Sequence, residues 1–392
     1  PLYSSAASDV YKRQNINASK ETIAEMTKDY EIKVYTESEE LPRLLEGNFF
    51  HSLELFEISE RVPGDTPVMA VASKDGQIAG QLLAVLHTHR TWFPPFIYTH
   101  AHAHGEGIYL NTEQAEEIFP LLLHSITRTL CNRHCLYIEF SELQKKMFGY
   151  RHFRRLGYFP VEWQEIYNSL HSMPPEERLT ERTRRQIECG ENKGLECHPA
   201  HHQEEVEKFY QLYRNFCRFK PRRYVPPIEY FKSMNESSGA KVFVTTYGGR
   251  RGGKDGREGK DGRDRRDGRD GRDGRSERSE RDGRKDEANK RKIVGGCTLA
   301  FSEGDAYLWH LASRRKRYIY LHPDTMTVWH AISYAHQQGC RHIHFMDVGL
   351  PWKRNPYRDF IRSFGGKPVA KYRWFRCNIG IINRLLKWFY KL

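Results

Sequence analysis

One carboxylate in the sequence stands where acid–base chemistry is usually placed. Asp347 ends the apolar run 342–347, which predicts a buried strand, and a loop that leads into a helix follows it. In α/β proteins this edge of the sheet is the usual catalytic edge. Asp347 is therefore a candidate general base or substrate-orienting group. It could equally cap the next helix or form a salt bridge with Arg358 or Lys353.

A second candidate is an unbroken run of cations. It lies between a strand predicted to end at Leu311 and a helix predicted after Pro323, and it consists of Arg314, Arg315, Lys316 and Arg317. Cationic side chains near a helix N-terminus suit phosphate groups. The sequence therefore predicts a phosphate-binding turn, with a solvated basic turn as the alternative.

Histidines recur at every second position in two places. The first set is His100, His102 and His104, and the second is His342 and His344. Alternate residues of a strand share one face, which superficially suits a metal ion. Nothing else in the sequence converges on either set, so the sequence predicts no metal site.

The elements that must position these residues occur twice along the chain. Runs 68–72 and 78–85 flank an Asp-Gly turn and predict a β-hairpin, and runs 242–247 and 293–300 predict a second one. A second repeated motif follows each hairpin, because the segment 150–157 resembles the segment 357–365. One domain plan is therefore used twice.

The order of the predicted elements is similar in the two halves. In the first half we expect strands at 32–35, 68–72, 78–86, 92–97, 136–140 and 161–170, and helices at 41–46, from Thr112 and at 148–156. In the second half we expect helices at 181–189, 203–219, 228–235, 324–338 and 356–363, and strands at 242–247, 293–300, 306–311, 342–347 and 369–376. This order predicts an α/β fold with a mixed sheet, divided into domains at 15–175 and 176–392.

Two segments are set apart from these domains. Residues 1–14 resemble a translated sequencing adaptor, so we expect a non-native leader. Residues 249–292 are built from Asp-Gly-Arg triplets without apolar side chains, which predicts a disordered insertion at the tip of the second hairpin. An Arg/Gly segment could instead tether RNA or another polyanion, although the alternating Asp residues offset the Arg charge.

Composition narrows the class of protein. The 392 residues carry a formal charge of +13, which suits an anionic ligand such as a nucleotide or a lipid phosphate without requiring one. The eight cysteines form no C-x-x-C pair, no apolar run is long enough to span a membrane, and no signal peptide is recognised. We therefore expect a cytoplasmic protein.

The ordered motifs of the second half carry a family resemblance. The arginine-rich segment 183–195, the Ile293–Gly296 strand start and the helix–strand unit 329–347 follow one another as in the Fem-type family of tandem GNAT acyltransferases. In the family motif the Asp precedes the Phe, whereas here Asp347 follows Phe345 and Met346. The chain thus resembles two GNAT-like domains in tandem.

The resemblance implies an N-acyltransferase that moves an acyl or aminoacyl group to an amine of a cell-envelope precursor or amino sugar. The donor would be acyl-CoA or aminoacyl-tRNA, and no metal is implied. The helical-hairpin arm that some family members use for tRNA has no counterpart, which favours acyl-CoA and makes nucleic acid a partner only with an aminoacyl-tRNA donor. The glycine-rich GNAT pyrophosphate loop is also missing, and 314–317 stand in its place.

The expected fold locates a site, and several residues of this sequence are candidates for roles in it. In a GNAT sheet two parallel strands diverge and expose backbone N–H groups for the donor carbonyl; here the divergence would fall between 308–311 and 343–347. Trp309 joins Asp347 at the expected catalytic centre. The expected substrate-binding residues are Arg184, Arg185, Tyr318, Trp352 and Arg358. The alternatives are that the aromatic residues belong to the core and that the two neighbouring arginines lie on a solvated helix face.

Two further interpretations remain open. Residues 381–392 combine apolar and basic side chains at helical spacing, so they could lie on an anionic membrane surface or pack back onto the domain. The chain could also be a non-catalytic binding protein that keeps the fold and uses its basic loop for nucleic acid or another polyanion.

Overall fold

The computed structural model describes residues 29–90, 96–143, 149–218, 224–248, 291–346 and 348–390. The leader 1–14, most of the insertion (249–290) and Asp347 lie outside these ranges. Within them the chain forms a mixed α/β structure built on one large, mostly antiparallel sheet, so the predicted fold class is confirmed.

The first half of the chain contains most of the elements predicted for it. They are β1 (Glu31–Tyr35), α2 (Leu53–Arg61), β2 (Asp65–Lys74), β3 (Gln77–Arg90), β4 (Ile97–His104), β5 (Ile108–Tyr109), α3 (Ala115–Asn132), β6 (Tyr137–Ser141), α4 (Tyr150–Arg155) and β7 (Phe159–Ser169). The helix predicted at 41–46 is wrong. Leu41 is extended there because Pro42 follows it and disfavours helical geometry.

The second half repeats the plan with two additional helices at its start. Its elements are α5 (Glu181–Asn192), β8 (Leu195–Pro199), α6 (Gln203–Cys217), α7 (Ile228–Glu236), β9 (Ala240–Tyr247), β10 (Lys292–Ser302), β11 (Asp305–Leu308), β12 (Ala312–Ser313), α9 (Pro323–Gln337), β13 (His342–Phe345), α10 (Pro356–Arg362), β14 (Lys367–Cys377) and α11 (Gly380–Phe389). Among the described residues, short 3-10 helices lie between elements at Ser38–Glu40, Phe49–His51, Thr112–Gln114 and Pro175–Arg178.

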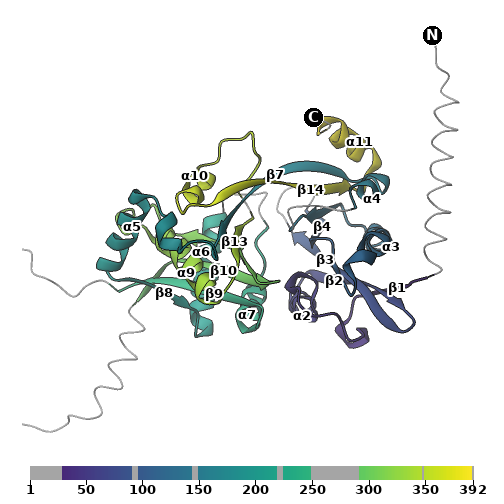
Figure 1. Cartoon of the computed structure of the whole chain (residues 1–392), viewed down its shortest axis with the longest axis horizontal. Coiled ribbons are helices and arrows are strands. Elements are labelled where there is room, and N and C mark those ends of the chain that lie inside the picture. Colours follow the sequence, from purple (N-terminus) through teal and green to yellow (C-terminus); the bar gives the residue numbers. More distant parts are fainter. Residues whose placement is uncertain are drawn as a thin grey trace, which may run out of the picture.

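The closing strands of the two halves are exchanged. The strand order is β1-β2-β3-β4-β6-β14-β7-β13-β11-β10-β9-β8, so β14 completes the first half and β7 completes the second. β7 and β14 also pair with each other, antiparallel, from Lys367 opposite Tyr167 to Phe375 opposite Phe159. Figure 1 shows these two long strands running from one lobe to the other. The two lobes therefore share one continuous sheet.

A buried ion pair crosses the junction between the exchanged strands. The Lys371 ammonium on β14 lies 2.7 Å from the Glu165 carboxylate on β7, and both side chains are almost wholly excluded from solvent. Lys371 also donates to the carbonyl of Leu143 at 2.6 Å. Removing either partner would leave an uncompensated buried charge, so the pair fixes how the strands meet.

Helices cover both faces of the sheet in each lobe. Apolar residues of α3 pack on one face of β2 and β3, while α2 packs on the other face. In the second lobe α9 covers one face, and α6 and α7 cover the opposite one. The core around α2 also includes Met234, Tyr307 and Met346 of the second half, so apolar packing joins the two lobes.

The described strands form two parallel pairs, one in each lobe. β4 pairs with β6, and β11 pairs with β13 through Ala306 opposite Ile343, ending at Leu308 opposite Phe345. Beyond Leu308 the chain leaves β13, and the N–H groups of Trp309 and His310 donate to the backbone and side chain of Thr298. The parallel pairing ends within the segments where the family resemblance placed the divergence, but these two N–H groups are already engaged.

The strand exchange can be tested at Trp374. This β14 side chain is fully buried in the core of the first lobe and stacks on Phe153 with ring centroids 4.8 Å apart. We expect Trp374→Ala to lower the free energy of unfolding by about 3–5 kcal/mol, as measured by urea denaturation.

The matched control is Trp352→Ala, because Trp352 is 64% exposed and should change the unfolding free energy by less than about 0.5 kcal/mol. Equal effects of the two substitutions would show that β14 does not complete the core of the first lobe.

Candidate functional site

Two cavities meet at the end of the parallel β11–β13 pairing. The larger one, of about 760 Å³, lies between the lobes and is lined by residues of both. The smaller one, of about 370 Å³, lies in the second lobe between the β11–β12 segment and helices α9 and α10. Leu308 and Trp309 line both cavities. The divergence of β11 from β13 therefore places one aromatic side chain at their junction.

Histidines from two neighbouring strands line one wall of the larger cavity. His87 on β3 lies directly opposite His100 on β4, and His102 and His104 continue along β4. The His104 ring lies 5.2 Å from Trp309, so this row of imidazoles reaches the junction.

A hydrogen-bonded group from both lobes closes one end of this row. The Asp65 carboxylate accepts from the Tyr224 hydroxyl at 3.0 Å and lies 2.8 Å from Nδ1 of His87. The cavity therefore offers imidazole and phenol groups, which bind hydroxyl and amine substituents by hydrogen bonds.

Burial keeps His100, His102 and His104 of this row neutral, together with the adjacent His89. It lowers the pKa of His89 to about 4, of His100 to about 2 and of His104 to about 3, with smaller contributions from neighbouring cationic groups. The pKa of His102 is also lowered well below its ordinary value, again mainly by burial. At neutral pH these side chains are uncharged, so they can take part in hydrogen bonds but resist protonation.

One ion pair on the exchanged strand provides the charges of the larger cavity. Arg373 of β14 donates to Glu139 of β6 at 3.0 Å and lies 4.1 Å above the Trp163 ring of β7. Its guanidinium also donates to the carbonyl of Met346 at 3.1 Å. The Glu139 carboxylate is thereby held where it can accept from an ammonium group in the cavity.

The smaller cavity has a largely apolar wall with several aromatic side chains, and one cation. Phe216, Tyr357 and Phe360 contribute the wall, and Arg315 lies at the edge beside the first turn of α9. Nε of Arg315 is 3.5 Å from the Asp324 carboxylate. Since α9 begins with Pro323, which has no N–H, and then Asp324, its N-terminus is poorly suited to cradle a phosphate. A phosphate here would depend on side-chain cations.

Of the predicted site residues, Trp309 and Arg315 line the cavities. Lys316 and Arg317 lie exposed in the same turn as Arg315, and Arg314 joins that turn to β10 through a backbone hydrogen bond to Val294. Asp347 is outside the described residues, although its neighbour Met346 lines the larger cavity.

The five predicted substrate-binding residues line neither cavity. Arg184 and Arg185 pair with Glu181 on the exposed face of α5. Tyr318 packs at the edge of a small core, and Trp352 is exposed. Arg358 donates to the carbonyls of Val348, Leu350 and Pro351, so it holds the loop that follows Asp347. These assignments remain predictions that the cavities do not support.

Sequence reasoning missed most of the larger cavity. It placed the histidines of β4 on one face but did not connect them with His87 on β3, although the same alternate spacing recurs at His87 and His89. Glu139 and Arg373 gave no local signal, because the strand exchange brings them together. Tyr224 gave none either, because it meets Asp65 and His87 only in the folded chain.

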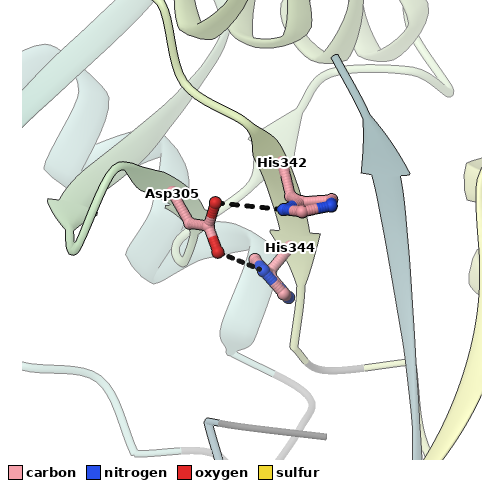
Figure 2. Close-up of side chains that lie close together, drawn as sticks. All are labelled: Asp305, His342 and His344. Atoms are coloured by element: carbon pink, nitrogen blue, oxygen red, sulfur yellow. Dashed lines mark hydrogen bonds and ion pairs between the residues drawn. The ribbon is translucent and has the colours of Figure 1, made fainter. Parts of the chain in front are cut away.

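A separate polar cluster lies at the other end of the β11–β13 pair, as Figure 2 shows. Asp305 begins β11, and its carboxylate lies 3.1 Å from Nδ1 of His342 and 3.4 Å from Nε2 of His344. Burial alone would raise the pKa of Asp305, but the hydrogen bonds from His344 and His342 outweigh it and lower that pKa.

Solved structures share this architecture. A crystal structure of FemX superposes with a TM-score of 0.56 at 12% identity, covering 91% of this chain and 100% of FemX. A tandem GNAT protein from the clavulanic acid biosynthesis pathway superposes with a TM-score of 0.51 at 10% identity, covering 89% of this chain and 99% of that protein. The chain has the tandem GNAT fold. No protein-family model and no curated protein matches its sequence.

The neutral histidines of this tandem GNAT fold make its stability depend on pH. In the unfolded chain they would bind protons below about pH 6.5, whereas the folded protein binds them only near pH 2–4. Their contribution to stability is complete above about pH 6.5 and is lost as the pH falls below it. We therefore expect the free energy of unfolding from urea titrations to fall between pH 7 and pH 4.5.

A variant isolates one contribution. His104→Phe keeps a ring against Phe50 and Trp309 but cannot be protonated. It should therefore reduce the slope of the unfolding free energy against pH by up to about 1.4 kcal/mol per pH unit. His336→Phe on the exposed face of α9 is the control. Identical slopes in the wild type and His104→Phe would contradict the assignment.

Proposed function

We propose that the protein is an N-acyltransferase whose donor occupies the smaller cavity and whose amine acceptor occupies the larger one. The observation that carries the proposal is the shared boundary of the two cavities at Leu308 and Trp309. Direct acyl transfer requires the thioester carbonyl and the amine nitrogen to be held within bonding reach. The tandem GNAT fold supports this reaction class over an unrelated one.

The proposed donor is acyl-CoA. Its pantetheine arm and acyl group would lie along Phe216 and Tyr357, and its phosphates would contact the exposed turn of Arg315, Lys316 and Arg317. Guanidinium and ammonium groups replace the glycine-rich backbone cradle in this arrangement. The Asp324 carboxylate at the start of α9 disfavours phosphates at the helix end itself, which directs them to the turn.

The proposed acceptor is an amine carried by a polar molecule such as an amino sugar or a cell-envelope precursor. An ammonium group would pair with Glu139 on entering the larger cavity, and hydroxyl groups would bind to the imidazole and phenol side chains of its wall. The amine must lose a proton before it attacks. Asp347 is the proposed acceptor of that proton. His104, which burial keeps neutral beside Trp309, would accept a hydrogen bond from the attacking amine.

Helix α11 supports a peripheral membrane contact for this enzyme. Its outward face exposes Ile381, Ile382, Leu385, Trp388 and Phe389. Residues 376–392 contain four Lys or Arg and no Asp or Glu, and the adjoining α4 adds three arginines. Exposed apolar rings flanked by cations suit the surface of an anionic bilayer.

The proposed contact would lie at the membrane surface. No helix of the described residues has both the length and the apolar character needed to cross a bilayer. The inner face of α11 packs back onto the first lobe, because Asn383 donates to the Gly157 carbonyl and Tyr390 stacks on Phe159. All eight cysteines are free, which supports a cytoplasmic location for the contact.

The two cavities can be separated kinetically. With acyl-CoA and an amino-sugar acceptor, Arg315→Ala should raise KM for acyl-CoA about tenfold, because it removes one charge-assisted contact. Glu139→Gln should instead raise KM for the amine by a similar factor. The measurement is release of the CoA thiol at varied concentrations of each substrate.

The controls are Arg128→Ala and Glu116→Gln, which alter exposed side chains of α3. If both site variants shift the same Michaelis constant, or if no acyl-CoA supports transfer to any amine, the assignment of the cavities is wrong.

Membrane contact has its own test. We expect the protein to co-float with vesicles that contain phosphatidylglycerol, and Leu385→Ser combined with Trp388→Ser to reduce the bound fraction at least fivefold. Trp352→Ser serves as the control because it removes an exposed Trp that lies outside α11. Equal flotation of both variants would exclude α11 as the contact.

A further inference from the structure

Asp305, His342 and His344 bring three metal-binding groups to one point. They come from two adjacent parallel strands, because Asp305 begins β11 while His342 and His344 occupy alternate positions of β13. Figure 2 shows the carboxylate facing both imidazoles, one oxygen toward each. Among the described residues it is the cluster whose possible ligand atoms all lie within 4.8 Å of one another.

The spacing fits a small divalent cation. A zinc ion about 2.0–2.1 Å from each ligand in tetrahedral geometry holds ligand atoms about 3.4 Å apart. The two carboxylate–imidazole distances here are 3.1 and 3.4 Å. Because all the possible ligand atoms lie within 4.8 Å of one another, small side-chain movements would bring them around one ion.

The surroundings hold the ligands while leaving an entrance. The His344 ring is stacked between Tyr307, at 4.8 Å, and Tyr167, at 6.1 Å, which fixes its plane. The three side chains remain between 10% and 24% exposed, so water can reach them. Three protein ligands and one solvent position make a four-coordinate site.

A neighbouring arginine, Arg341, would repel a metal ion bound at this cluster. Nε of Arg341 lies 3.6 Å from the Asp305 carboxylate, and this arginine side chain is 60% exposed. Its terminal nitrogen is anchored to the Glu303 carbonyl at 2.5 Å. The arginine thus reduces the affinity for a cation without filling the position between the imidazoles, and its removal should strengthen binding.

We propose that Asp305, His342 and His344 bind one zinc-type divalent cation that ties the start of β11 to the start of β13. The opposite end of the same pair diverges at Leu308, beside both cavities, so the ion would brace the strands that position Trp309. The proposal departs from the sequence expectation that no metal is present. It does not rest on the transferase assignment, and either can fail alone.

The test uses the full chain, stripped of metal and titrated with Zn²⁺ by calorimetry and with Co²⁺ by visible absorption. We expect one equivalent of Zn²⁺ to bind, a tetrahedral Co²⁺ spectrum, and a rise in Tm with Zn²⁺. His342→Ala and Asp305→Asn should each weaken Zn²⁺ binding at least tenfold and abolish the rise in Tm. Arg341→Ala should tighten binding at least threefold.

The control variants are His171→Ala, beside the cluster but outside it, and His102→Phe in the larger cavity. Both should keep one equivalent of Zn²⁺ with unchanged affinity. Circular dichroism establishes that each variant is folded. The proposal is overturned if Zn²⁺ does not bind at all, if His342→Ala binds it as the wild type does, or if His102→Phe removes it.

Discussion

The antiparallel pairing of β7 with β14 is the constraint on which the rest of the structure depends. It joins two lobes into one sheet, and the buried Glu165–Lys371 pair holds its centre. The same pairing brings Arg373 of β14 between Glu139 of β6 and Trp163 of β7. The charged end of the larger cavity therefore exists only because each lobe is completed by the last strand of the other.

The two copies of the domain plan have become different parts of one site. Each contains one parallel strand pair, β4–β6 in the first lobe and β11–β13 in the second. The first pair carries the neutral histidines of the larger cavity, whereas the second diverges at Leu308 and opens the smaller one. In the proposed reaction the first lobe supplies much of the acceptor wall, and the second lobe binds the donor and presents Trp309. Duplication thus supplies two complementary surfaces, which meet at Leu308 and Trp309.

The features predicted correctly from the sequence are those that depend on neighbouring residues. Hairpins, the long helices and the repeated order follow from apolar periodicity and turn chemistry, and the divergence after Leu308 followed from the family resemblance. The strand exchange was not predictable, because β7 and β14 are similar closing strands and nothing local states which neighbour each one joins. For the same reason Arg373 and Glu139 escaped notice. Arg358 was expected among the substrate-binding residues, but its guanidinium holds backbone carbonyls. Asp305 was missed because the third member of the His342–His344 cluster lies on another strand.

The central claim is that donor and acceptor meet at Trp309 from two separate cavities. The most direct measurement is a crystal structure with a bisubstrate analogue in which CoA is linked through its sulfur to an amino sugar. The account predicts that the pantetheine arm lies in the smaller cavity, that the sugar lies among the histidines of the larger one, and that the linkage passes Trp309. A CoA moiety bound in the larger cavity, or an analogue bound away from Trp309, would contradict it.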